Sequence, residues 1–188
     1  MRIIGGEHRG KGIAPPRNFS ARPTTDFAKE GLFNTLCNMY DFEEISVLDL
    51  FAGTGGITYE FASRGCTSIT TIEMNQIHSN FIKSTIAKLN LKGVNLVRHN
   101  VFDFIEICRI SFDIIFADPP YDLDGLSKLP DKILSKNLLN VGGLLILEHP
   151  SSFDFSKHPA FFKAKKYGNV HFAFFKTADP IETISQIN

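Results

Sequence analysis

The chain has few cysteines, no tryptophan and no net charge. Its 188 residues include three cysteines, Cys37, Cys66 and Cys108, which lie far apart and form no CxxC motif. This spacing argues against disulfide bonds and zinc and favours a reducing compartment, so we expect a cytoplasmic protein. The histidines show no metal-ligand spacing, and no metal site is expected.

Long apolar runs are also missing. No run approaches the roughly 20 residues that cross a bilayer, and the N-terminal segment lacks the apolar core of a signal peptide. Apolar residues make up 43% of the chain and charged residues 21%, which is ordinary for a globular protein of one domain. We therefore expect no membrane partner.

The basic residues are unevenly distributed. Residues 1–24 contain five basic side chains and one acidic side chain, a net charge of +4 on a chain that is neutral as a whole. A basic arm of this kind indicates a contact with phosphate groups, although a solvated tail would give the same pattern. We therefore divide the chain into a basic β-ribbon or loop (1–24), a main domain (25–176) and a polar tail (177–188).

Short apolar segments alternate with helical patterns through the main domain. This alternation predicts an α/β fold with a parallel, doubly wound sheet. Thr24 or Thr25 is the expected N-cap of a first helix, and Gly168-Asn169 predicts a tight turn in a final antiparallel hairpin. The predicted strands are 45–51, 67–73, 94–98, 112–117, 141–148, 164–167 and 171–176. The predicted helices after the first are 57–64, 76–89, a short one after residue 100, and 126–139.

The stretch FDIIFADPPY carries the strongest chemical signal. Residues 112–117 form a short apolar run that is typical of a buried strand, and two prolines end it. Asp118 then lies at the carboxyl end of a strand, where open α/β sheets bind ligands. A fixed carboxylate, the rigid Pro119-Pro120 turn and the ring of Tyr121 could hold a planar amine. A plain surface turn is the alternative interpretation.

The first strand leads into the loop Asp49-Leu-Phe-Ala-Gly53-Thr-Gly55-Gly56. Glycines there let the backbone approach a ligand at a helix N-terminus. A dinucleotide site would need a third glycine where Thr58 stands, and a phosphate-binding Walker loop would need a lysine. The loop therefore suits a cofactor that has an amino-acid head and no pyrophosphate.

Two further polar residues follow the next strands. Glu73 ends the second strand, where an acid accepts hydrogen bonds from ribose hydroxyls, although it could instead serve the following helix. Asn100 follows the third strand and could accept the exocyclic amine of adenine, a role for which Asp103 competes. Together these residues describe a nucleoside with an amino-acid head, which is S-adenosylmethionine.

The segments DLFAGTGG and DPPY resemble those of class I methyltransferases that act on exocyclic amines. With MRIIGGEHRGKGI, RPTTDFAKEGLFNTL and LLILEH, the chain closely resembles the RsmD family of bacterial 16S ribosomal RNA guanine-N2 methyltransferases, from residue 1 to about 176. The resemblance implies a Rossmann-like class I methyltransferase fold, with a seven-stranded, mostly parallel sheet, a reversed last strand and a small N-terminal β extension.

The resemblance also implies the roles of individual residues. Asp118 and the Pro119 carbonyl would orient the guanine amine, Pro120 would stiffen the turn, and Tyr121 would stack on the base. The residues expected to bind S-adenosylmethionine are Arg22, Thr24, Thr25, Asp49, Phe51, Gly53, Gly55, Glu73, Met74, Asn100 and Val101. The residues expected to bind RNA are Arg2, His8, Arg9, Lys11 and Arg17.

The expected activity is methylation of a guanine N2 in 16S ribosomal RNA by a monomer, on the small subunit or an assembly intermediate. Three alternatives stay open at this point. A DNA adenine-N6 methyltransferase shares the DPPY motif, a non-catalytic S-adenosylmethionine-binding RNA module shares the cofactor loop, and a nicotinamide enzyme is disfavoured by Thr58.

Overall fold

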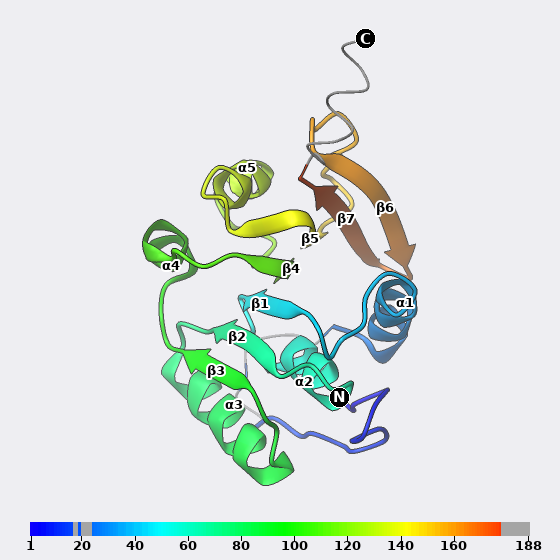
Figure 1. Cartoon of the computed structure of the whole chain (residues 1–188), viewed down its shortest axis with the longest axis vertical. Helices are drawn as coiled ribbons and strands as arrows, with labels where there is room; N and C mark the ends of the chain where they lie inside the picture. Colours follow the sequence, from blue (N-terminus) through cyan, green and yellow to red (C-terminus); the bar gives the residue numbers. More distant parts are fainter. Residues whose placement is uncertain (17–18, 20–23, 178–188) are drawn as a thin grey trace.

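A seven-stranded β-sheet forms the centre of the protein (Figure 1). The computed structural model describes residues 1–16, 19 and 24–177. The strands are β1 (Ser46–Leu50), β2 (Ser68–Ile72), β3 (Val94–Val97), β4 (Phe112–Ala117), β5 (Leu139–His149), β6 (Phe161–Tyr167) and β7 (Val170–Lys176). Their order is β3-β2-β1-β4-β5-β7-β6, and β7 alone runs opposite to the other strands. The predicted sheet with a reversed last strand is confirmed.

Side chains alternate between the two faces of the sheet, and each face is covered by helices (Figure 1). On β4, Ile114 and Phe116 pack with the helices α1 (Asp26–Leu36) and α2 (Gly56–Ser63). Ile115 and Ala117 pack on the other face with α4 (Val101–Ile107) and α5 (Leu129–Leu134). The helix α3 (Gln76–Leu89) connects β2 to β3. Because both faces are covered, ligands can reach the sheet only at its edges or strand ends.

Two predicted boundaries are resolved or corrected. The hydroxyl of Thr25 accepts a hydrogen bond from the Ala28 N–H at 3.2 Å, so Thr25 rather than Thr24 is the N-cap of α1. The predicted helix 126–139 is wrong in length: a 3-10 turn, Leu126–Lys128, precedes α5, which ends at Leu134. Asn137 has a φ of +53°, which breaks the helix, and Leu139 pairs with Phe112 in the sheet.

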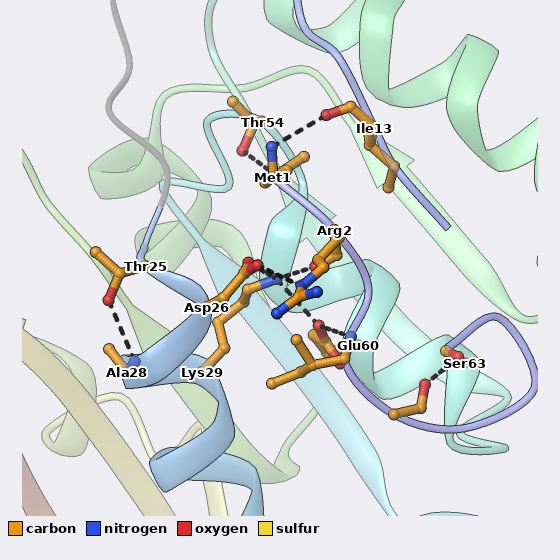
Figure 2. Close-up of polar contacts among 12 residues, drawn as sticks. Met1, Arg2, Ile13, Thr25, Asp26, Ala28, Lys29, Thr54, Glu60 and Ser63 are labelled. Carbon is orange, nitrogen blue, oxygen red and sulfur yellow. Dashed lines mark hydrogen bonds and ion pairs between the residues drawn. The ribbon is translucent and has the colours of Figure 1, made fainter. Parts of the chain in front are cut away.

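The N-terminal segment folds back on itself and packs against α1 and α2 (Figure 2). A single antiparallel bridge joins Arg2 and Gly12, and this bridge is all that the described residues contain of the expected β extension. The ammonium of Lys29 on α1 donates to the Arg2 carbonyl at 2.5 Å and to the Glu60 carboxylate at 3.1 Å. Both side chains are buried, with exposed fractions of 2% and 0%. Glu60 also accepts the Ile4 N–H at 2.9 Å, so both members of this buried ion pair attach the N-terminal backbone to the main domain.

Within residues 1–16, 19 and 24–177, no helix is long and apolar enough to cross a membrane. The same part of the chain contains no group of three or more histidine, cysteine, aspartate or glutamate side chains that could hold a metal ion.

Candidate functional site

A cavity of about 1060 Å³ opens at the carboxyl ends of β1, β2, β4 and β5. This is the edge at which open α/β sheets bind ligands. The predicted site residues that line it are Thr24, Thr25, Asp49, Phe51, Gly53, Glu73, Met74, Asn100, Val101, Asp118, Pro119, Pro120 and Tyr121. Gly55 does not line it, and Arg22 falls outside the described residues. The structure therefore brings the predicted cofactor loop and the predicted base-holding turn into one cavity.

Four acidic side chains from neighbouring strands lie along the cavity: Glu73, Asp49, Asp118 and Glu148. Asp49 pairs with Thr71 on β2 and with Phe116 on β4, and Glu73 and Asp118 each follow these partners by two residues. Ala117 pairs with Leu147, so Glu148 lies beside Asp118. Because strand side chains alternate, all four acids lie on one face of the sheet. The cavity thus offers hydrogen-bond acceptors along its length and favours a ligand rich in donors or positive charge.

Asp49 accepts hydrogen bonds from Thr58, which stands where a dinucleotide fingerprint needs a glycine. Thr58 donates its backbone N–H at 3.1 Å and its hydroxyl at 2.6 Å to one oxygen of Asp49. Asp49 has an exposed fraction of 1%. Burial raises the pKa of Asp49 to about 7, the two bonds from Thr58 oppose this rise, and the nearby Glu73 charge adds to it. This carboxyl therefore changes charge near neutral pH.

Glu73 joins the end of β2 to the glycine loop. Its two carboxylate oxygens accept the Gly53 N–H at 2.8 Å and the Asn75 N–H at 2.7 Å. The loop can make this contact because Phe51 and Gly53 both have positive φ angles, 60° and 54°. Glu73 is thus fixed by backbone donors on either side, with its carboxylate in the wall of the cavity.

Gly55 shapes the loop from outside the cavity. It is the N-cap of α2, with a φ of +79°, and a Cβ atom there would lie 2.6 Å from the ring of Tyr59. Only glycine fits both conditions, because other residues are strained at this φ and would meet the ring. The sequence signal at Gly55 therefore has a steric origin in the turn.

Asn100 has a capping contact that the sequence did not suggest. Its side-chain oxygen accepts the Phe102 N–H at 2.8 Å and the Asp103 N–H at 3.4 Å, so it is the N-cap of α4. Its amide nitrogen lies 3.6 Å from the sulfur of Met74. The contact of this oxygen with an adenine amine stays a prediction, and Asp103 lies in the first turn of α4.

Glu148 was not among the predicted site residues, yet it lies beside the base-holding turn. One of its oxygens accepts the Tyr121 hydroxyl at 3.1 Å, and the other accepts the Thr24 hydroxyl at 3.3 Å. Its exposed fraction is 5%. Burial, then the charges of Glu148 and Asp49, raise the pKa of Asp118 well above its ordinary value. The sequence could have identified Glu148 in the way it identified Glu73, because both are acids near the end of a buried strand.

Other lining residues were not among the predicted site residues. Phe27 is 65% exposed, and its ring meets that of Tyr167 edge-on at 6.1 Å. Met1 lines the cavity and accepts the Thr54 hydroxyl on its sulfur at 3.3 Å (Figure 2). Lys29 also lines the cavity, although its ammonium donates to Arg2 and Glu60. The N-terminal segment and α1 thus form part of the cavity wall.

The predicted RNA-binding residues differ in their surroundings. Arg2 pairs with Asp26 at 2.8 Å, and its side chain is largely exposed. His8 is buried, with its ring nitrogen 3.0 Å from the Lys11 ammonium. Arg9 and Lys11 are exposed. Arg17 falls outside the described residues.

Comparison with known proteins gives consistent matches along the chain. The family model described as conserved hypothetical protein 95 matches residues 1–176. The chain is 28% identical to the ribosomal RNA small subunit methyltransferase D of Buchnera aphidicola subsp. Baizongia pistaciae over 179 residues, which cover 93% of this chain and 91% of that protein. It is 35% identical to the protein of the same name from Escherichia coli K12 over 121 residues, which cover 64% and 60% of the two chains.

Solved structures match the fold closely. The putative methyltransferase yhhF from Escherichia coli has a TM-score of 0.82 and 27% identity, with coverage of 95% of this chain and 98% of that one. The Thermus thermophilus 16S rRNA N2 methyltransferase RsmC, in complex with AdoMet and guanosine, has a TM-score of 0.66 and 21% identity, with coverage of 85% and 45%. The second likeness is one of fold alone.

Proposed function

The chain belongs to the family described as conserved hypothetical protein 95, and we propose that it is an S-adenosylmethionine-dependent methyltransferase that modifies the N2 of a guanine in 16S ribosomal RNA. The family match confirms the resemblance to the RsmD family, and the relatives' names support the RNA substrate. The observation that carries the proposal is the shared cavity of the glycine loop and the Asp118–Tyr121 turn. The substrate would be the small subunit or an assembly intermediate, and the protein would act as a monomer.

The side chains in the cavity fit S-adenosylmethionine. Its ribose hydroxyls and ammonium are donors, and the acids Glu73 and Asp49 beside the Gly53 loop are acceptors for them. A volume of about 1060 Å³ leaves space for a nucleoside cofactor and a flipped base together. Met74, Asn100 and Val101 lie at the adenine end in this proposal. The pattern of acceptors therefore supports this cofactor over a dinucleotide.

Asp118 would orient the amine that receives the methyl group. Its carboxylate and the Pro119 carbonyl would accept the two N2–H bonds, which aims the nitrogen and stabilises the charge that develops on it. S-adenosylmethionine, held by Glu73, Asp49 and the Gly53 loop, would supply an activated methyl group: N2 would gain the methyl as the C–S bond breaks with its electrons left on sulfur, and N2 would lose one proton. Asp118 would then be the carboxylate nearest to N2 and would accept that proton.

The RNA would have to present an unstacked base. Sequence-specific RNA recognition usually targets unpaired bases, and unstacking costs a few kcal/mol. The ring of Tyr121 is about half exposed at the cavity and would stack on the base. Arg9 and Lys11 would contact phosphates, because both are exposed on the basic N-terminal segment. We extend this proposal to Arg2, His8 and Arg17, which lie in the same segment.

Mass mapping of ribosomal RNA nucleosides tests the proposal. Small subunits from cells that lack the protein should accept one methyl group from the purified protein and S-adenosylmethionine, and the product should be N2-methylguanosine. Formation of N6-methyladenosine, or transfer to duplex DNA alone, would contradict it. Asp118→Ala should lose more than about 90% of the rate, at least ~1.4 kcal/mol of transition-state stabilisation, while its S-adenosylmethionine affinity stays close to that of the wild type.

A further inference from the structure

Asp118 and Glu148 form a pair of carboxyl groups at the base end of the cavity. They directly follow Ala117 and Leu147, which are partners on the adjacent parallel strands β4 and β5. Both side chains therefore lie on one face of the sheet and at the same level, and both line the cavity. The pairing of β4 with β5 therefore brings the two carboxyl groups to neighbouring positions.

The carboxylate of Glu148 is oriented by two hydroxyl groups from other segments. Tyr121 donates to one oxygen and Thr24 donates to the other, at 3.1 and 3.3 Å. Because Tyr121 is the ring that would stack on the base, its bond to Glu148 places this carboxylate beside the stacked base. Glu148 thus lies where it can meet the edge of a base whose amine is bound at Asp118.

The edges of guanine and adenine differ next to the reactive amine. Beside its N2 amine, guanine carries an N1–H donor, whereas adenine carries an N1 acceptor beside its N6 amine. An ionised carboxylate is an acceptor only, so it can bind the guanine N1–H and is repelled by an N1 acceptor. Two neighbouring acceptors therefore match two neighbouring donors, and only guanine presents both.

We propose that Glu148 selects guanine by accepting its N1–H while Asp118 accepts N2–H. This inference rests on the proposed function and assigns the base specificity of the same site to one residue. Two buried carboxylates repel each other, and the N1–H and N2–H donors of a bound guanine would reduce this repulsion. The raised pKa of Asp118, partly due to Glu148, is consistent with such a pair.

The test replaces the target guanosine by 2-aminopurine riboside, which keeps the N2 amine and has an unprotonated N1. Small-subunit RNA that carries either nucleoside at the mapped position is assembled into particles and methylated. The wild type should prefer guanine by more than about tenfold. Glu148→Gln can donate an amide N–H to N1, so it should lower kcat/KM for guanine by about 10- to 100-fold, the range for one charged hydrogen bond, and remove or reverse the preference.

Controls separate base selection from a structural role. If Glu148 only holds Tyr121 in place, Glu148→Gln and Tyr121→Phe will lower both rates equally and leave the preference unchanged, which overturns the inference. Glu44→Gln, at the opposite end of the sheet, is the matched control for a lost charge and should behave as the wild type. If Glu148→Gln does not fold, the wild-type preference decides: equal transfer to both bases overturns the inference. A wild type that forms no N2-methylguanosine instead overturns the proposed function.

Discussion

Thr58 donates both its backbone N–H and its hydroxyl to the same oxygen of Asp49, and the same hydroxyl lies 2.8 Å from that of Thr71. A glycine at position 58, as in a dinucleotide fingerprint, would leave the buried carboxyl with one donor fewer. The threonine thus explains how an acid with an exposed fraction of 1% is accommodated at the end of β1. Burial nevertheless raises the pKa of Asp49, so the protonation of Asp49 links folding to pH.

The first prediction concerns this linkage in the ligand-free protein. Burial raises the pKa of Asp49 from 3.8 to about 7, so between these values the folded protein binds a proton that the unfolded chain has released. The Asp49 contribution to the free energy of unfolding should therefore fall as pH rises from 4 to 7. Relative to Asp49→Asn, the wild type should lose up to about 4 kcal/mol across this window, measured by urea unfolding.

Asp113→Asn is the control, because the pKa of Asp113 is shifted in the opposite direction, below its ordinary value. Burial alone would raise the Asp113 pKa, but hydrogen bonds from Ser46 and Asn140 outweigh it and lower the pKa. The stabilisation by Asp113 is then present above pH 3.8 and is lost only as pH falls through the lowered pKa. The difference between wild type and Asp113→Asn should stay constant from pH 4 to 7. A constant difference for Asp49→Asn as well would contradict the first prediction.

The second prediction concerns Glu73, which we propose to bind the ribose hydroxyls. Glu73→Ala should weaken S-adenosylmethionine binding by roughly 1.5–3 kcal/mol, because it removes a charged acceptor and releases the Gly53 N–H that Glu73 binds. Calorimetry of the folded variant measures the change. Glu106→Ala removes an acid on α4 that pairs with Lys136 and should bind the cofactor as the wild type does. Unchanged affinity in Glu73→Ala would rule out the ribose assignment.

The third prediction concerns the buried pair of Lys29 on α1 and Glu60 on α2, which Figure 2 shows beside the N-terminal segment. Glu60→Gln should reduce the free energy of unfolding by about 3 kcal/mol, because it removes the nearest carboxylate from the buried Lys29 ammonium, which keeps only the more distant Asp26 at 3.5 Å. The double variant with Lys29→Met should lose less than the sum of the single changes. Glu30→Gln, an exposed acid on α1, should change stability little. Additive losses in the double variant would mean that the pair is not coupled.

The fourth prediction concerns the basic segment. Replacing Arg9 and Lys11 by alanine should lower RNA affinity and flatten the dependence of log K on log salt by about 0.7–0.9 per lost phosphate contact. The matched control is the pair Lys83→Ala and Lys88→Ala on α3, two exposed lysines of the same charge. Binding titrations over a range of salt concentrations measure this slope for the wild type, the Arg9/Lys11 variant and the Lys83/Lys88 control. An equal slope for the wild type and the Arg9/Lys11 variant would mean that the segment is only solvated.

Local patterns in the sequence were enough to predict most of the sheet. Apolar runs bounded by turn residues predicted β1, β2 and β4, and the glycine loop and DPPY turn predicted which strand ends would carry a site. These signals are local because alternation, glycine at positive φ and paired prolines act within a few residues. The cavity's central residues, Asp49, Glu73 and Asp118, could be named for that reason.

Other parts of the site depend on contacts between distant segments. Glu148 joins Tyr121 and Thr24 only because β5 pairs with β4 and the N-terminal segment reaches the same strand ends. The predicted helix 126–139 was too long because Leu139 enters the sheet opposite Phe112, a pairing that helical periodicity cannot reveal. Side chains such as Glu148 acquire a role from partners that lie up to 124 residues away, and long-range packing alone determines which partners meet.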